Sequence, residues 1–166
     1  MRVLIIRHGT AIDPHEAESD GQRWLTLEGR RTMRQVASAL DDAGVHFDRV
    51  FTSPLVRAVQ SAEILVARHG FEGPIEVWDA LAGGTTALAA AALERAAPEE
   101  TVALVGHEPL VRSIVAHLTG TRSMFPFRTG AACLVERDGS NGAFRWMFDP
   151  RTLMRIESVS QLIEEG

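Results

Sequence analysis

The hydrophobic and polar positions of the chain alternate in a way that predicts strands and helices in turn. Short, mostly apolar runs are typical of strands buried on both faces of a parallel sheet. They occur at residues 3–6, 47–52, 75–78 and 101–105. Each run is followed, directly or after a loop, by a longer stretch with apolar residues at helical spacing. These stretches predict helices at residues 26–44, 53–70, 85–97 and 109–118.

Capping residues mark where two of these helices begin and where one ends. Thr26 is a typical N-cap, Glu28 is favourable in the first turn, and Gly44 ends this helix. Ser53 followed by Pro54 predicts the start of the next helix, because a capping residue and a proline at the first helical position both favour it.

Two regions do not follow this alternation. The polar segment at residues 12–23 carries turn signals and is long for a loop in a compact domain, so we expect a flap over a functional site. Toward the end of the chain, residues 131–136 and 143–148 flank a polar, glycine-containing turn and predict a hairpin. A short closing helix is expected at residues 152–165.

Strands that alternate with helices and then end in a hairpin predict an α/β fold. We expect a three-layer α/β/α sandwich with a mainly parallel central sheet and a C-terminal hairpin. Residues 1–166 should form a single domain, since the length suits one and no linker or repeat divides the chain. Right-handed crossovers would bring the carboxyl ends of the parallel strands to one edge of the sheet.

Composition narrows the class of protein. The chain is 45% hydrophobic and 23% charged, as in ordinary globular proteins, and its net charge of −5 argues against a nucleic-acid partner. The single cysteine, Cys133, lies in an apolar run, which predicts a buried thiol and excludes an internal disulfide. The sequence shows no signal peptide or membrane-spanning run, so we expect a cytoplasmic monomer without a membrane partner.

Cations and imidazoles follow three of the predicted strands. Arg7 and His8 come directly after the first strand, Ser53 and Arg57 follow the second, and His107 follows the fourth. Open α/β sheets bind ligands at the carboxyl ends of their strands, so these side chains should meet. Arginines and the free N–H groups of helix N-termini bind phosphate. The predicted ligand is therefore a phosphoryl group.

The same residue types argue against metal chemistry. No carboxylate cluster suggests Mg²⁺, and two histidines lack the third ligand of a catalytic zinc. We therefore expect phosphoryl transfer without a metal or cofactor. In it, one neutral imidazole attacks phosphorus, the arginines and the other histidine hold the phosphoryl oxygens, and water then hydrolyses the phosphohistidine.

The chain resembles the histidine phosphatase superfamily, also called the phosphoglycerate-mutase-like fold. The resemblance rests on Arg7-His8-Gly9, on residues 25–29 and 52–62, and on Gly106-His107, which follow the family's order over nearly the whole chain. The small size and the residues at 141–146 resemble the SixA-type phosphohistidine phosphatases.

This resemblance implies a role for each site residue. His8 would be the phosphorylated nucleophile, and Arg7, Arg57 and His107 would form the rest of the phosphate pocket. Ser53 would be a further contact to substrate. The expected partner is a phosphorylated protein, such as a histidine-phosphotransfer domain or a phosphocarrier, or a small phosphorylated molecule.

The sequence departs from the larger family after the third strand. Many members carry a glutamate general acid in a Leu-x-Glu motif, but residues 79–84 have Ala82 there, which cannot donate a proton. An alkoxide leaving group needs protonation and an imidazole needs little, so the substitution favours phosphohistidine as substrate. A small-molecule phosphomonoesterase using Asp13, Asp79 or Glu108 as acid is an alternative, and a non-catalytic phosphate-binding module is a second. For Glu108 we favour capping of the next helix or orientation of His107.

Overall fold

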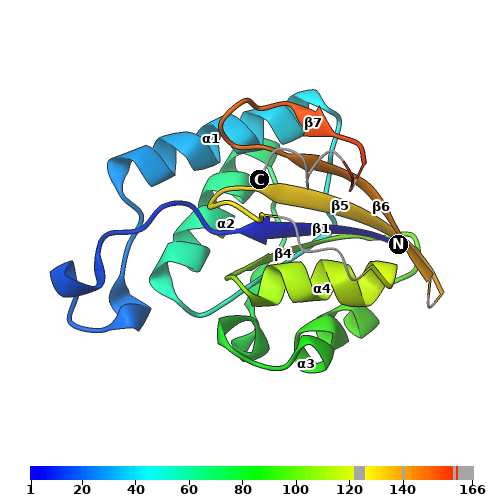
Figure 1. The fold of residues 1–166 in the computed structure, drawn as a ribbon, viewed down its shortest axis with the longest axis horizontal. Coiled ribbons are helices and arrows are strands. Elements are labelled where there is room, and N and C mark those ends of the chain that lie inside the picture. Colours follow the sequence, from blue (N-terminus) through cyan, green and yellow to red (C-terminus); the bar gives the residue numbers. More distant parts are fainter. Residues whose placement is uncertain (122–125, 140, 159, 161–166) are drawn as a thin grey trace.

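The computed structural model describes residues 1–121, 126–139, 141–158 and 160. Within them, seven strands form one sheet in the order β3-β2-β4-β1-β5-β6-β7 (Figure 1). Their bounds are β1 Arg2–Arg7, β2 Arg49–Thr52, β3 Ile75–Val77, β4 Thr101–Gly106, β5 Ala132–Asp138, β6 Asn141–Phe148 and β7 Arg155–Ile156.

The sheet is parallel on one side and antiparallel on the other. Strands β1 to β4 pair in parallel. On the other side, β5 pairs antiparallel with β1, β6 antiparallel with β5, and β7 antiparallel with β6. The predicted hairpin is confirmed as β5 and β6, with Gly139 at a φ of +57° in the connection. A positive φ suits glycine because it has no Cβ to clash.

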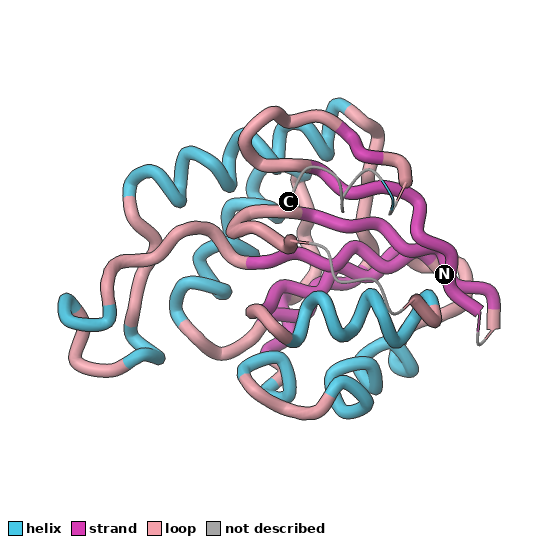
Figure 2. The backbone as a smooth tube through the Cα atoms, viewed as in Figure 1, coloured by secondary structure: helices cyan, strands magenta, loops and turns pink. Residues whose placement is uncertain are grey.

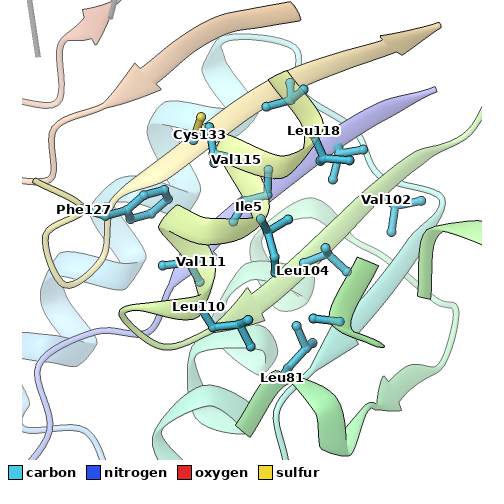
Figure 3. Close-up of a cluster of buried hydrophobic side chains, with 14 of the residues drawn as sticks. Ile5, Leu81, Val102, Leu104, Leu110, Val111, Val115, Leu118, Phe127 and Cys133 are labelled. Carbon is cyan, nitrogen blue, oxygen red and sulfur yellow. The ribbon is translucent and has the colours of Figure 1, made fainter. Parts of the chain in front are cut away.

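Both faces of the sheet are buried, because successive side chains of a strand point to opposite sides. In β1, Val3 and Ile5 pack in a cluster with α4, whereas Leu4 and Ile6 pack in a second cluster with α1 and α2. All four side chains are 0% exposed. Figure 3 shows the first cluster, in which Ile5 lies beneath the side chains of α4. The predicted three-layer sandwich is therefore confirmed (Figure 2).

The helices run over α1 Leu27–Asp42, α2 Val56–His69, α3 Thr86–Ala90 and α4 Leu110–Thr119. As predicted, Thr26 caps α1, its Oγ1 accepting a hydrogen bond from the Gly29 amide at 2.9 Å. The predicted start of α2 at Ser53 and Pro54 is wrong. Ser53 Oγ accepts a hydrogen bond from the Leu55 amide, which makes a turn before the helix begins at Val56.

Two further predictions about secondary structure are wrong in part. The alanine-rich helix expected at residues 85–97 is the short helix α3 followed by a 3₁₀ helix, η4 Ala91–Arg95. Trp78 Nε1 donates a hydrogen bond to the Leu88 carbonyl at 3.1 Å. In a continuous α-helix this carbonyl would accept from the amide of the residue four positions later. Of the closing helix expected at 152–165, residues 155 and 156 instead form β7, which pairs with the end of β6, whereas Ser160 is helical. Residues 159 and 161–166 lie outside the described part.

The polar segment after β1 contains two 3₁₀ turns, η1 Pro14–Glu16 and η2 Asp20–Gln22. Its two ends are joined, since Ala11 and Leu25 form a bridge and the Ile12 amide donates to the Trp24 carbonyl at 2.9 Å. Figure 1 shows this segment reaching beyond the carboxyl end of β1. Among the described residues, no helix is both long and apolar enough to span a membrane.

Candidate active site

The predicted site residues gather where β1, β2 and β4 end. The sheet order places β4 between β2 and β1, so the three carboxyl ends are neighbours. Backbone hydrogen bonds continue past the strands: the His8 amide donates to the Gly106 carbonyl at 3.1 Å, and the Ser53 amide donates to the Val105 carbonyl at 3.0 Å. His8, Ser53 and His107 are thereby held side by side by backbone geometry alone.

His8 is buried, and its two ring nitrogens have different partners. Nδ1 lies 2.6 Å from the Gly9 carbonyl oxygen, which can only accept, so Nδ1 carries the proton. Nε2 is then unprotonated, and its lone pair accepts a hydrogen bond from the Nε–H of Arg57 at 3.3 Å. The imidazole is thus presented in the tautomer whose Nε2 can act as a nucleophile.

The backbone at Gly9 is packed too closely for a side chain. A Cβ there would lie 2.8 Å from Met33 Cγ and 2.9 Å from the Gly29 carbonyl oxygen. The Gly9 amide donates to Ser61 Oγ at 3.1 Å, and this hydroxyl donates in turn to the Arg57 carbonyl at 2.7 Å. Ser61 is 0% exposed and joins the turn after β1 to the first turn of α2. Sequence reasoning missed this role, because a serine within a helix carries no distinct signal.

His107 lies against His8 on the other side of the site. Their ring centroids are 4.7 Å apart, and His107 Nε2 lies 2.8 Å from Ser53 Oγ. The second nitrogen of His107, Nδ1, is buried and has no hydrogen-bond partner among the described residues.

Burial keeps both imidazoles neutral. It lowers the pKa of His8 to about 4. The hydrogen bond to the Gly9 carbonyl raises this pKa, whereas the charges of Arg57 and Arg7 lower it further. Burial likewise lowers the pKa of His107 to about 3, with His8 and Arg57 contributing. At neutral pH the positive charge of the site comes from its arginines, and His8 is in the form that can attack phosphorus.

Arg7 lies at the rim of the site. Its NH1 donates to the Phe127 carbonyl at 2.8 Å, and its Nε is buried without a hydrogen-bond partner in the described part of the chain. Of the predicted residues, the structure brings His8, Arg57, His107 and Ser53 into direct contact, whereas Arg7 acts on both imidazoles through its charge. The Nε–H group of Arg7 is thus unpaired within the described residues.

Asp20 enters the site from the segment after β1 and was not predicted. Its Oδ2 accepts a hydrogen bond from Arg57 NH2 at 2.9 Å, and its backbone carbonyl accepts from Arg57 NH1 at 2.6 Å. Arg23 and then Arg57 hold the pKa of the Asp20 carboxyl below its usual range, so it is ionised. The expected flap therefore does reach the site, and it places a carboxylate on Arg57. The sequence marked Asp20 only as part of a turn.

The three acids considered from the sequence lie in different places. Asp13 and Asp79 are exposed and touch none of the site residues in the described structure. Glu108 lines a hollow together with Arg7 and forms an ion pair with Arg112, at 3.4 Å between Oε2 and NH2. The expectation that it caps α4 or orients His107 is wrong, since its carboxylate makes neither contact. Burial raises its pKa. In the described residues, no cluster of three or more His, Cys, Asp or Glu could hold a metal ion.

Comparison with known proteins agrees with this geometry. The sequence profile of the histidine phosphatase superfamily (branch 1) matches residues 3–83. Phosphohistidine phosphatase SixA of Escherichia coli (strain K12) is 33% identical over 163 residues, covering 96% of this chain and 100% of the relative. The chain belongs to the histidine phosphatase superfamily. An uncharacterized protein of Picosynechococcus is 42% identical over 112 residues, covering 66% of this chain and 67% of its own.

Solved structures of this superfamily show the same fold. The protein histidine phosphatase SixA complexed with tungstate matches with a TM-score of 0.84 at 34% identity, covering 93% of this chain and 100% of that one. The predictions of the superfamily, of the phosphoglycerate-mutase-like fold and of a phosphatase of this class are thereby confirmed. The catalytic role of each residue remains a prediction.

Proposed function

We propose that this member of the histidine phosphatase superfamily removes the phosphoryl group from phosphohistidine on a protein, with His8 as nucleophile. The observation that carries the proposal is the pair of contacts on His8. The Gly9 carbonyl holds the Nδ1 proton, and the unprotonated Nε2 accepts a hydrogen bond from Arg57 Nε. The likeness to SixA over nearly the full length supports this substrate class.

In the first step, His8 Nε2 attacks the phosphorus of the substrate. A bond forms between Nε2 and phosphorus, and the bond from phosphorus to the substrate's imidazole nitrogen breaks. If the substrate ring is protonated on its second nitrogen, it leaves as neutral imidazole. Arg57 lies on His8 Nε2, so its guanidinium can bind the phosphoryl oxygens as charge develops on them.

In the second step, water hydrolyses the phosphorylated His8. An oxygen–phosphorus bond forms, the Nε2–phosphorus bond breaks, and its electron pair returns to Nε2. The proton of the water passes to the released phosphate or to solvent. The Gly9 carbonyl keeps the Nδ1 proton throughout, so the same tautomer is restored for the next turnover.

The lack of a glutamate at Ala82 supports an N–P substrate rather than an ester. Ala82 ends a 3₁₀ helix, η3 Asp79–Ala82, that follows β3, and its methyl group has no proton to donate. A phosphate ester leaves as an alkoxide, which needs an acid, whereas a protonated phosphoimidazole does not.

Glu108 favours one alternative. Its buried carboxylate, with a raised pKa and no hydrogen-bond partner among the described residues, lines the hollow beside Arg7. A carboxyl group of that kind could protonate an ester oxygen, as a small-molecule phosphomonoesterase requires. Glu108→Gln would then abolish ester turnover and spare phosphohistidine turnover.

The test compares phosphate release from a phosphohistidine protein and from p-nitrophenyl phosphate. We expect the phosphohistidine protein to be the much better substrate, and His8→Ala to lower kcat by about a thousandfold or more. Acid quenching during turnover should trap a phosphoenzyme that His8→Ala does not form. His69→Ala, which changes a histidine at the end of α2, is the control.

Each outcome bears on one reading. Faster turnover of the ester, lost in Glu108→Gln, would replace the proposal by the phosphomonoesterase. Phosphate binding without any phosphoenzyme on either substrate would favour a non-catalytic binding module. Full activity in His8→Ala would overturn the assigned nucleophile.

A further inference from the structure

Two hollows meet beside the phosphate pocket, and Arg7 and Arg128 line both of them. One, of about 450 Å³, is also lined by Thr10, Thr32 and Thr129. The other, of about 440 Å³, runs along the start of α4. Arg128 therefore lies between two spaces that both open beside Arg7, the residue that precedes His8.

The turn that carries Arg128 is fixed to the catalytic strand. The Gly130 amide lies 3.1 Å from the Arg7 carbonyl and 3.0 Å from the His8 carbonyl, and it donates to both. Arg7 NH1 returns a hydrogen bond to the Phe127 carbonyl at 2.8 Å. Gly130 has a φ of +84°, and a Cβ there would lie 3.0 Å from Thr32 Cγ2. The position of residue 128 relative to the nucleophile is therefore set by backbone contacts.

Arg128 differs from its charged neighbours in making no direct contact with a charged group in the described part of the chain, although its charge helps to lower the pKa of the Asp149 carboxyl. Arg151, which lines the first hollow, is paired with Asp149 at 3.0 Å, and Arg112, which lines the second, is paired with Glu108. Within the described residues, the guanidinium of Arg128 makes no hydrogen bond or salt bridge, and its side chain is only half-buried. It is a cation held at the rim with its donors unused.

We infer that Arg128 forms a second anion-binding subsite, which takes a carboxylate of the phosphorylated partner protein while the phosphoryl group binds at His8. This inference rests on the proposed function and names the partner's chemistry: an acidic surface around the phosphohistidine. A guanidinium binds a carboxylate through two parallel N–H donors, so one acidic side chain can satisfy Arg128.

Charge at the rim is complementary to such a partner. The lining of the two hollows includes four arginines and two glutamates, Glu28 and Glu108, although the whole chain carries a net charge of −5. An acidic protein would be repelled by the chain as a whole and attracted at this rim, which orients it with its phosphohistidine toward Arg7 and His8.

The test uses two synthetic phosphohistidine peptides that differ only in having glutamate or glutamine on both sides of the phosphohistidine. At low ionic strength, we expect the wild type to have a kcat/KM about five- to tenfold higher for the glutamate peptide, mainly through KM. Arg128→Gln should reduce this preference to less than about twofold, and Arg128→Lys should restore part of it. Arg2→Gln removes the same charge at the opposite end of β1 and should keep the full preference.

Two further measurements separate recognition from structural damage. The loss in Arg128→Gln should be at least about threefold greater for the glutamate peptide than for p-nitrophenyl phosphate, which has no flanking carboxylate. Equal losses on both would overturn the inference, as would a preference that Arg128→Gln retains or that Arg2→Gln also loses.

Binding of the two peptides to His8→Ala, followed by calorimetry, repeats the comparison without turnover. If the wild type hydrolyses neither peptide but His8→Ala binds the glutamate peptide more tightly through Arg128, the proposed function fails and the subsite stands. If both peptides are hydrolysed at equal rates, the proposed function stands and the subsite fails.

Discussion

The contact between Asp20 and Arg57 predicts that phosphate must displace a carboxylate to bind. Three of the five N–H groups of Arg57 are engaged, by His8 Nε2, by the Asp20 carbonyl and by Asp20 Oδ2. A phosphoryl group on His8 would compete with the Asp20 carboxylate, because both are anions that need the same donors. Asp20→Asn removes the charge and leaves the backbone carbonyl contact in place.

The size of the effect follows from exposure. The Asp20 side chain is 60% exposed and that of Arg57 is 8% exposed, so solvent screens much of the attraction. Such a pair contributes about 0.5–1 kcal/mol, which corresponds to about a two- to fivefold change in affinity. We therefore expect Asp20→Asn to lower the inhibition constants of inorganic phosphate and tungstate by about two- to fivefold, and KM by a similar factor.

The assay is competitive inhibition of phosphatase activity by phosphate and tungstate, measured for the wild type, Asp20→Asn and Glu18→Gln. Glu18 is an exposed carboxylate of the same segment, so its variant controls for the general loss of negative charge. Weaker phosphate binding in Asp20→Asn, or a kcat that falls by about tenfold or more, would refute displacement. It would show instead that the carboxylate positions Arg57 or handles a proton during the reaction.

Four further predictions concern acidity and packing. Because the pKa of His8 is lowered to about 4, kcat/KM should stay level from pH 8 to 5 and fall only below that, whereas a decline centred near 6.5 would contradict the burial argument. The same shift means that, as the pH falls below about 6.5, the unfolded chain binds a proton on His8 that the folded chain does not bind. Urea titrations should therefore show the free energy of unfolding falling between pH 6.5 and 4, by about 3 kcal/mol for this residue. The decrease should be smaller in His8→Gln. Ser61→Ala leaves the buried Gly9 amide without an acceptor, and we expect a loss of about 1–3 kcal/mol in unfolding free energy together with lower kcat, which a purely structural loss would not cause. Gly29→Ala places a Cβ 2.1 Å from the Thr10 carbonyl oxygen and should lower stability by about 2 kcal/mol or more, in contrast to Gly21→Ala, whose Cβ meets only ordinary contacts.

The sequence was sufficient where the physics is local or follows a general rule of sheets. The apolar runs predict β1 and β4, and Thr26 caps α1 through a hydroxyl three residues from the amide it binds. His8 and His107 could be placed together because parallel strands bring their carboxyl ends to one edge, whatever the rest of the chain does. The candidate site was therefore predicted from strand ends alone.

The sequence was insufficient where a contact joins residues far apart in the chain. Ser53 reads as a helix cap, but in the fold its hydroxyl meets His107, 54 residues later, and α2 begins only at Val56. Residues 155 and 156 read as part of a helix, but in the fold they form β7 and pair with the end of β6. Local propensities are weak, and a long-range partner overrides them.

Composition and pattern by themselves determined the class of fold, the edge of the sheet that carries the chemistry, and five of its polar side chains. Only the tertiary structure decided which groups surround them: Asp20 on Arg57, Ser61 beneath Gly9, and Arg128 unpaired beside Arg7. The reason is physical. Side-chain periodicity and capping act within a few residues, whereas the groups that bind, shield and orient a nucleophile are brought to it by chain segments that leave no local trace of where they will meet.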